Sequence, residues 1–140
     1  ADDNIVIDAG KEEGVQAGAL VLAAGGAIHI GTIAQASSHT ALVRLLSHAG
    51  EKTNVYASES GISSVATGKG GGILEMQVPA SIIVHQGEPL FSAGPPDFLV
   101  GYIEQIEKSD AGPFQIARTS HPVAITDVRL VFIVIQDGYE

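Results

Sequence analysis

Short apolar runs alternate along the chain with turns rich in glycine, proline, asparagine and serine, a pattern typical of β-strands. The one helix-compatible stretch, Ser38–Leu46, carries enough Val and Thr to form a strand equally well. The Gly25-Gly26 pair is expected to turn the chain between two apolar runs, because glycine tolerates positive φ. The pattern predicts an all-β protein with strands over Asn4–Asp8, Ala19–Ala23, Ala27–Ala36, Ala41–Leu46, Thr53–Ala57, Ile73–Val78, Ser81–Val84, Pro89–Ser92, Val100–Glu107, Pro113–Arg118 and Asp127–Gln136.

Two apolar stretches carry further expectations. Leu130–Ile135 is apolar at every position, so we expect both faces of that strand to be covered. Gly14–Val43 contains no Asp, Glu, Lys or Arg, which raises the question of a membrane span. Glycines and the polar residues Gln, Ser and His interrupt it throughout, so we interpret it as buried strands joined by glycine turns.

An internal repeat relates the two halves of the chain. Gly18–Gly25 followed by Ile30–Gln35 corresponds to Gly87–Gly94 followed by Val100–Gln105. The correspondence continues from Leu42–Arg44 to Ile116–Arg118, and from Ser47-His48 to Ser120-His121. Corresponding blocks in the same order indicate a duplicated β unit.

Each unit holds five or six short strands with glycine at the bends, which suits a small closed barrel. We therefore predict two small duplicated β-barrels of about six strands each, packed in tandem. The first would cover residues 1–60 and the second residues 61–140, with the boundary between residues 58 and 78. Gly61–Gly72, which is small, polar and rich in glycine, is the expected connector.

Composition removes several classes of function. The chain has no cysteine, which excludes disulfide scaffolds, thiolate metal sites and thiol catalysis. Its net charge of −9 and its seven scattered Lys and Arg residues argue against nucleic acid as a partner and against an anionic membrane surface. With 45% hydrophobic residues, the chain carries too much apolar surface to remain disordered.

No pattern of reactive residues stands out. The five histidines show no spacing typical of a metal site, and no Gly-x-Ser-x-Gly elbow accompanies the serines. The run Thr67–Gly72 lacks the glycine and Ser/Thr positions of a phosphate-binding loop. We predict no catalytic residue, no cofactor and no metal. Two alternatives remain: a trypsin-like double-barrel serine hydrolase, which a Ser–His–Asp cluster at hydrogen-bond distance would favour, and a small-ligand-binding β module.

One loop is a candidate for binding a partner protein. Pro95 and Pro96 rigidify it and lower the cost of ordering on binding, and Phe98 and Leu99 follow as apolar contact residues. Strand addition at an open barrel edge is a second possible mode of association, and it could also build homo-oligomers.

The glycine and strand pattern resembles a known family. Ile7–Val21, with spaced glycines between two apolar strands, is similar to the start of the extracytoplasmic region of the rod shape-determining protein MreC family. Gly87–Gly94, then Phe98–Ile103, resembles the second signature of that family, and Asp127–Ile135 fits its final strand. Glu88 stands where the family usually has Asp, and Pro95–Phe98 is a shorter form of its Phe-Pro loop.

The resemblance implies two β-barrel domains on the periplasmic side of the cytoplasmic membrane. It implies a non-enzymatic scaffold of cell-shape maintenance and cell-wall elongation that organises membrane and periplasmic peptidoglycan-synthesis proteins. The implied partners are a transpeptidase, MreD and, indirectly, the MreB filament, together with self-association. The membrane anchor is expected upstream of Ala1, since the chain reads as a piece of a longer protein.

Overall fold

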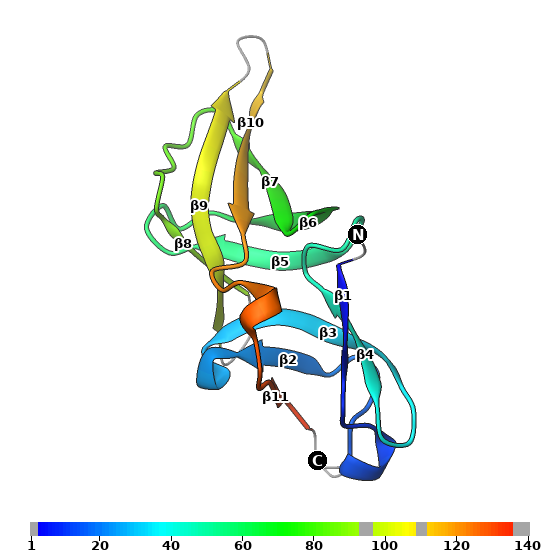
Figure 1. Ribbon diagram of the computed structural model, residues 1–140. Helices are drawn as coiled ribbons and strands as arrows, with labels where there is room; N and C mark the ends of the chain where they lie inside the picture. Colours follow the sequence, from blue (N-terminus) through cyan, green and yellow to red (C-terminus); the bar gives the residue numbers. More distant parts are fainter. Residues whose placement is uncertain (1–2, 93–96, 109–111, 136–140) are drawn as a thin grey trace, which may run out of the picture.

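A computed structural model describes residues 3–92, 97–108 and 112–135. This part of the chain is almost entirely β, as the sequence predicts, and holds three short 3-10 helices and no α-helix (Figure 1). The elements are β1 (Asn4–Ile7), η1 (Lys11–Glu13), β2 (Leu20–Ala23), η2 (Ala24–Gly26), β3 (Ile28–Ala36), β4 (Ala41–Leu45), β5 (Lys52–Ala57), β6 (Ser63–Gly70), β7 (Ile73–Pro79), β8 (Pro89–Ser92), β9 (Phe98–Lys108), β10 (Phe114–Ser120), η3 (Ile125–Asp127) and β11 (Phe132–Ile133). As expected, the Gly25-Gly26 pair turns the chain between β2 and β3.

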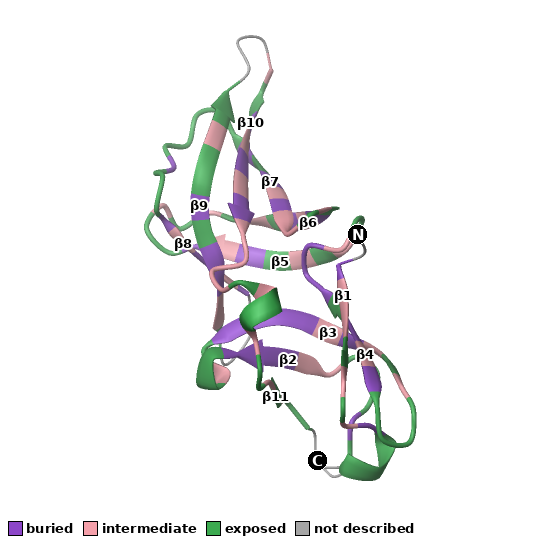
Figure 2. Cartoon of the chain, in the orientation of Figure 1, coloured by how far each residue is buried: buried purple, intermediate pink, exposed green. Residues whose placement is uncertain are grey.

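Six strands close into a barrel. Their antiparallel pairing runs β5–β6–β7–β10–β9–β8 and returns from β8 to β5. Buried residues alternate with more exposed ones along β6, β7 and β10 (Figure 2), as expected where every second side chain points into the barrel. The interior is filled mainly by aliphatic side chains and one methionine, including Val55, Leu74, Met76, Leu90 and Ile103. A barrel this narrow is filled without aromatic rings, in agreement with the low aromatic content.

The rest of the chain forms an open sheet and not a second barrel. Its strand order is β1–β4–β3–β2–β11, with β1 and β11 at the two edges within the described residues. The expectation of two closed barrels in tandem is therefore not confirmed, and the six-stranded ring is the one closure found there. The reason lies in β5, which precedes residue 61 but pairs with β6 and β8. The N-terminal half is left with too few strands to close.

The last strand returns to the open sheet. β11 pairs antiparallel with β2, through Phe132 opposite Leu22 and Ile133 opposite Val21. The expectation that Leu130–Ile135 is covered on both faces is wrong. An edge strand on an open sheet packs only one face, so Ile133 contacts the core while Leu130 is 71% and Phe132 47% exposed.

Two further strand predictions need correction. Gly61–Gly72, expected as a connector, contains β6, whose residues Ala66 and Gly68 face inward between β5 and β7. Its glycines made the segment resemble a linker, although its positions alternate as a strand requires. Ser81–Val84, expected as a strand, forms a turn instead, because Gln115 Nε2 donates to the carbonyl oxygens of Pro79 and Ile82. The division of the chain into two domains at residue 61 stays a prediction.

The segments related by the sequence repeat occupy corresponding places. β2–β3–β4 and β8–β9–β10 are each a run of three consecutive antiparallel strands with a glycine inside the middle strand. A Cβ on Gly31 would lie 2.5 Å from the Arg44 carbonyl oxygen, and one on Gly101 would lie 2.7 Å from the Ser120 carbonyl oxygen. Both glycines therefore allow close approach of the next strand.

Candidate functional site

The open sheet and the barrel meet at a polar cluster, which we call the joint: the buried side chains of Asp3 and Ser47, the partly buried His121, and the backbone of Gly71 and Gly72. Ser47 Oγ donates to Asp3 Oδ2 at 2.5 Å. The N–H groups of Gly71 and Gly72 donate to the same carboxylate at 3.1 and 2.8 Å. Ser47 Oγ also lies 2.9 Å from His121 Nε2. The cluster ties the start of β1, the β4–β5 loop, the β6–β7 turn and the segment after β10.

The joint has a defined protonation state. Burial raises the pKa of Asp3, but the hydrogen bonds from Ser47, Gly72 and Gly71 outweigh it and hold this pKa below its usual value. Burial lowers the pKa of His121, against an opposing attraction from Asp3. At neutral pH the joint therefore contains a carboxylate and a neutral imidazole.

This Asp–Ser–His cluster does not have the geometry of a catalytic triad. In a triad the imidazole lies between the acid and the serine and takes the serine proton. Here Ser47 lies in the middle and gives its single hydrogen to Asp3, so His121 Nε2 must donate to Ser47 Oγ. The serine is also fully buried, which closes it to a substrate. The cluster thus gives the hydrolase alternative no support.

A second histidine, which is buried, lies close to the joint. His29 on β3 is 4% exposed, and its Nε2 donates to the Gly31 carbonyl oxygen at 3.0 Å. Burial lowers the pKa of His29, the Gly31 carbonyl raises it, and electrostatic repulsion from His121 lowers it further. The Nδ1 atoms of His29 and His121 are both buried, and neither has a hydrogen-bond partner within the described residues.

A groove of about 700 Å³ runs between the open sheet and the barrel. Gln16, Thr32 and His29 line it from the sheet side, and Asn54 and Phe98 from the barrel side. Its lining is mixed in polarity and includes one aromatic ring. The joint and the groove are thus neighbouring parts of one interface within the molecule.

The structure describes only two of the four residues predicted to bind a partner. Phe98, at the start of β9, is half-buried and lines the groove, whereas Leu99 packs against the core of the open sheet beside Ile28. Pro95 and Pro96 lie outside the described residues. Tyr56, which the sequence gave no reason to select, stacks on Phe91 and donates to Asp97 Oδ2 at 2.8 Å. The partner-binding role of this loop stays a prediction.

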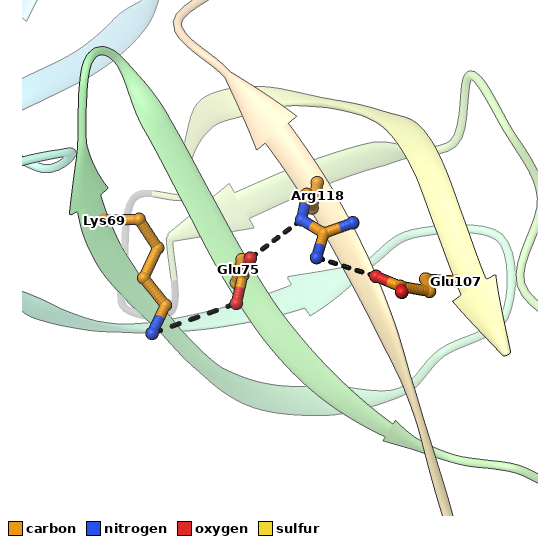
Figure 3. Close-up of polar contacts among 4 residues, drawn as sticks. All are labelled: Lys69, Glu75, Glu107 and Arg118. Carbon is orange, nitrogen blue, oxygen red and sulfur yellow. Dashed lines mark hydrogen bonds and ion pairs between the residues drawn. The ribbon is translucent and has the colours of Figure 1, made fainter. Parts of the chain in front are cut away.

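The outer wall of the barrel carries a row of alternating charges, which we call the charge ladder (Figure 3). Arg118 on β10 donates to Glu75 on β7 and to Glu107 on β9, each at 2.7 Å. Lys69 on β6 lies 3.9 Å from the same Glu75. These bonds raise the pKa of Arg118. Two of the seven basic residues of the chain are thus neutralised by carboxylates.

Exposed apolar side chains gather along the edge strand β11. Phe132 of β11 and the flanking residues Leu130, Val134 and Ile135 are between 38% and 71% exposed, at one edge of the open sheet. Aliphatic and aromatic residues on an unprotected edge are a usual mark of an association surface. Sequence reasoning missed this surface because an unbroken apolar run does not tell which face of a strand is covered.

A known protein family matches almost the whole chain. The family model described as rod shape-determining protein MreC, barrel core, matches residues 1–135. The chain belongs to the MreC family. The crystal structure of MreC from Pseudomonas aeruginosa is 25% identical and superposes with a TM-score of 0.88, covering 96% of this chain and 90% of that one. No curated protein sequence matches the chain.

Two other solved MreC structures share the fold. MreC from Listeria monocytogenes is 22% identical with a TM-score of 0.77, over 94% of this chain and 67% of that one. A structure titled as the major periplasmic domain of the cell shape-determining filament MreC is 16% identical with a TM-score of 0.64, over 87% of this chain and 79% of that one. MreC proteins determine cell shape, and this chain spans their barrel core.

The described residues offer neither a membrane-spanning helix nor a cluster of metal ligands. No helix there has the length and apolar character needed to cross a membrane. The uncharged run Gly14–Val43 instead forms β2, β3 and the start of β4, with Val21, Ile30 and Ile33 in the core of the open sheet. Within the same ranges, no three His, Asp or Glu side chains lie close enough to hold a metal ion.

Proposed function

We propose that this chain is a non-enzymatic scaffold of cell-wall elongation, which acts on the periplasmic side of the cytoplasmic membrane and is anchored there by a segment upstream of Ala1. Membership of a cell-shape-determining family supports this role. The observation that carries it is the exposed apolar edge of β11, which offers side chains and backbone groups to another protein.

The proposed partners are a peptidoglycan transpeptidase, MreD and, indirectly, the MreB filament, together with further copies of this chain. The fold suits such a task, because two surfaces are held on rigid elements at different places. β11 and the residues just before it present Phe132 and Leu130 on the open sheet, and the loop after β7 presents Ile83, which is 74% exposed, on the barrel. A partner docks on such apolar patches without any reactive group.

The proposal is tested in a rod-shaped bacterium whose own gene for this protein is replaced by variants. The double variant L130E/F132E puts charges on the outer face of β11 and leaves the inward-facing Ile133 in place. We expect rounded cells, and loss of co-purification with the transpeptidase or MreD. V6E, which charges an equally exposed residue on β1 at the opposite edge of the open sheet, is the matched control.

Rods of normal width in the L130E/F132E strain, with full-length protein at normal abundance, would overturn the use of β11. A reactive-serine probe that labels the purified protein would contradict the non-enzymatic role.

A further inference from the structure

His121 in the joint and the neighbouring His29 are two histidines that the proposed scaffold role does not use. His29 is buried and His121 is partly buried. His121 lies on the segment that leaves the barrel, and His29 lies on the central strand of the open sheet. The two imidazoles are close enough to interact electrostatically, and each hides an Nδ1 atom without a hydrogen-bond partner in the described residues. A neutral imidazole tolerates this position, since an unprotonated Nδ1 loses only an acceptor bond.

Protonation of the two imidazoles makes their unpaired Nδ1 atoms unfavourable. Each Nδ1 would then carry a buried hydrogen with nothing to receive it, which costs more than an unpaired neutral nitrogen. Two neighbouring like charges would also repel each other. The geometry thus couples the charge of two side chains to the contact between sheet and barrel.

We propose that the joint is a pH-sensitive latch: it holds the open sheet against the barrel when His29 and His121 are neutral, and it releases when both become protonated. The sheet and the barrel have distinct hydrophobic core clusters, and Leu99 of β9, which pairs with Ile28 and packs on the sheet core, is the contact about which the joint can open. Opening changes the angle between the β11 edge and the barrel, and with it the spacing of the two proposed docking surfaces.

The surrounding charges define the pH at which this happens. Asp3, from the start of the chain, attracts a proton to His121 but stays ionised itself, because three donors hold its pKa low. The β6–β7 turn contributes only the backbone N–H groups of Gly71 and Gly72. On the groove side, Glu51 and Lys52 are the charged residues that line the same space as His29, and Glu51 lies 4.0 Å from Arg44. Burial places the titration of both imidazoles below the usual value of about 6.5, and ordinary carboxyl groups titrate lower than an ordinary imidazole.

Spin labels can follow the latch directly, because the chain has no cysteine of its own. Gln35 on the sheet and Ser63 on the barrel are both exposed, so Q35C/S63C places one label on each part. We expect a single narrow distance distribution at pH 7.5, and a second, broader population at pH 5 that disappears when the pH is restored. Unchanged distances across this range would overturn the proposal.

Matched histidine variants show whether His29 and His121 cause the change in label distance with pH. Glutamine cannot be protonated but can still donate to the Gly31 carbonyl or to Ser47, so H29Q/H121Q is expected to keep the narrow distribution at pH 5. H39Q and H85Q, which alter exposed histidines, should respond as the parent protein does. A response that persists undiminished in H29Q/H121Q would place the titrating group elsewhere and contradict the latch.

A measurement on the unmutated histidines tests the proposal without any variant that could misfold. Imidazole resonances of His29 and His121, followed by NMR, should titrate over the pH range in which the label distances change. If the distances change only below the range of imidazole titration, the carboxyl groups are responsible and the proposal fails. This outcome is independent of the scaffold role, which rests on β11.

Discussion

Ser47 Oγ donates a 2.5 Å hydrogen bond to Asp3 Oδ2 across 44 residues of sequence, and the same carboxylate accepts the N–H groups of Gly71 and Gly72 from the barrel. Replacing Asp3 by asparagine removes the negative charge that accepts hydrogen bonds from Ser47, Gly71 and Gly72. We expect D3N to lower the free energy of unfolding by about 2–3 kcal/mol, the usual loss when buried donors to a charged acceptor are left poorly paired. Urea denaturation at pH 7 measures it. D8N, which alters an exposed carboxyl group nearby, should change stability by less than about 0.5 kcal/mol.

Stability should fall as the pH drops from 7 to 5. The pKa values of His29 and His121 are lower in the folded chain than in the unfolded chain, chiefly through burial, so the unfolded chain binds more protons in this range. Stability is therefore complete above the unfolded pKa, about 6.5, and is lost as the pH falls below it. Thermal unfolding of H29Q/H121Q should show a flatter profile across this window. An identical slope in the parent and the variant would show that other groups titrate.

Glu88 should control a second, more acidic transition. Its carboxylate is fully buried, yet it accepts N–H bonds from Glu59, Ser60 and His85. Burial raises its pKa, but these bonds outweigh it and leave the pKa below the usual value. Its contribution is present above the unfolded pKa, about 4.3, and is lost as the pH falls below that value.

The substitution E88Q tests this directly. It should cost about 2 kcal/mol at pH 7 and reduce the loss of stability between pH 4.5 and 3, as measured by denaturant titration. E12Q, at an exposed position, is the control. A loss at pH 7 that is no larger for E88Q than for E12Q would show that the three N–H groups find other acceptors.

Gly68 should be intolerant of any side chain. A Cβ there would lie 2.1 Å from the His48 carbonyl oxygen, where β6 passes the β4–β5 loop. We expect G68A to cost about 3 kcal/mol or more, because backbone cannot move aside as a side chain can. G25A is a useful comparison: Gly25 has φ +70° but open space around it, so only the backbone preference of about 1 kcal/mol is lost. Equal melting temperatures for the two variants would contradict the steric argument.

The charge ladder should contribute little to stability. Arg118 is about one-third exposed and Glu107 mostly exposed, so water and salt screen their attraction. We expect R118A to cost about 1 kcal/mol or less in dilute buffer, and less again in 1 M salt. K11A, at an exposed 3-10 helix position, provides the baseline for removal of one positive charge. A larger loss that salt does not diminish would indicate packing of the arginine stem instead.

Most strands could be predicted from the sequence, because period-two alternation and glycine turns report local backbone geometry. β6 was missed because Gly68 and Gly70 look like linker residues, and the reason for Gly68 is a close approach to a loop about twenty residues earlier. Closure was misjudged for a similar reason. Which neighbour β5 pairs with, and whether Phe132 faces core or water, depend on tertiary contacts that no local pattern records.

The joint could not be predicted from the sequence. Ser47 and His121 belong to repeat blocks that were noted, but the repeat pairs Ser47 with Ser120 in sequence, whereas the structure pairs it with His121 in space. Asp3 was assigned no role, since an acid near a chain end is usually solvated. Only the folded topology brings these side chains together, and burial then changes their pKa values.

The return of β11 to β2 has a consequence for the order of folding. The barrel closes with strands between residues 52 and 120, so its contacts are formed within one continuous stretch of chain. The open sheet is complete only when Ile133 pairs with Val21, which lies near the other end of the chain. Pairings between distant residues form slowly, since the chain entropy must be lost before the contact is gained. We therefore expect the barrel to fold first, with the sheet completed last and β11 the final strand to dock.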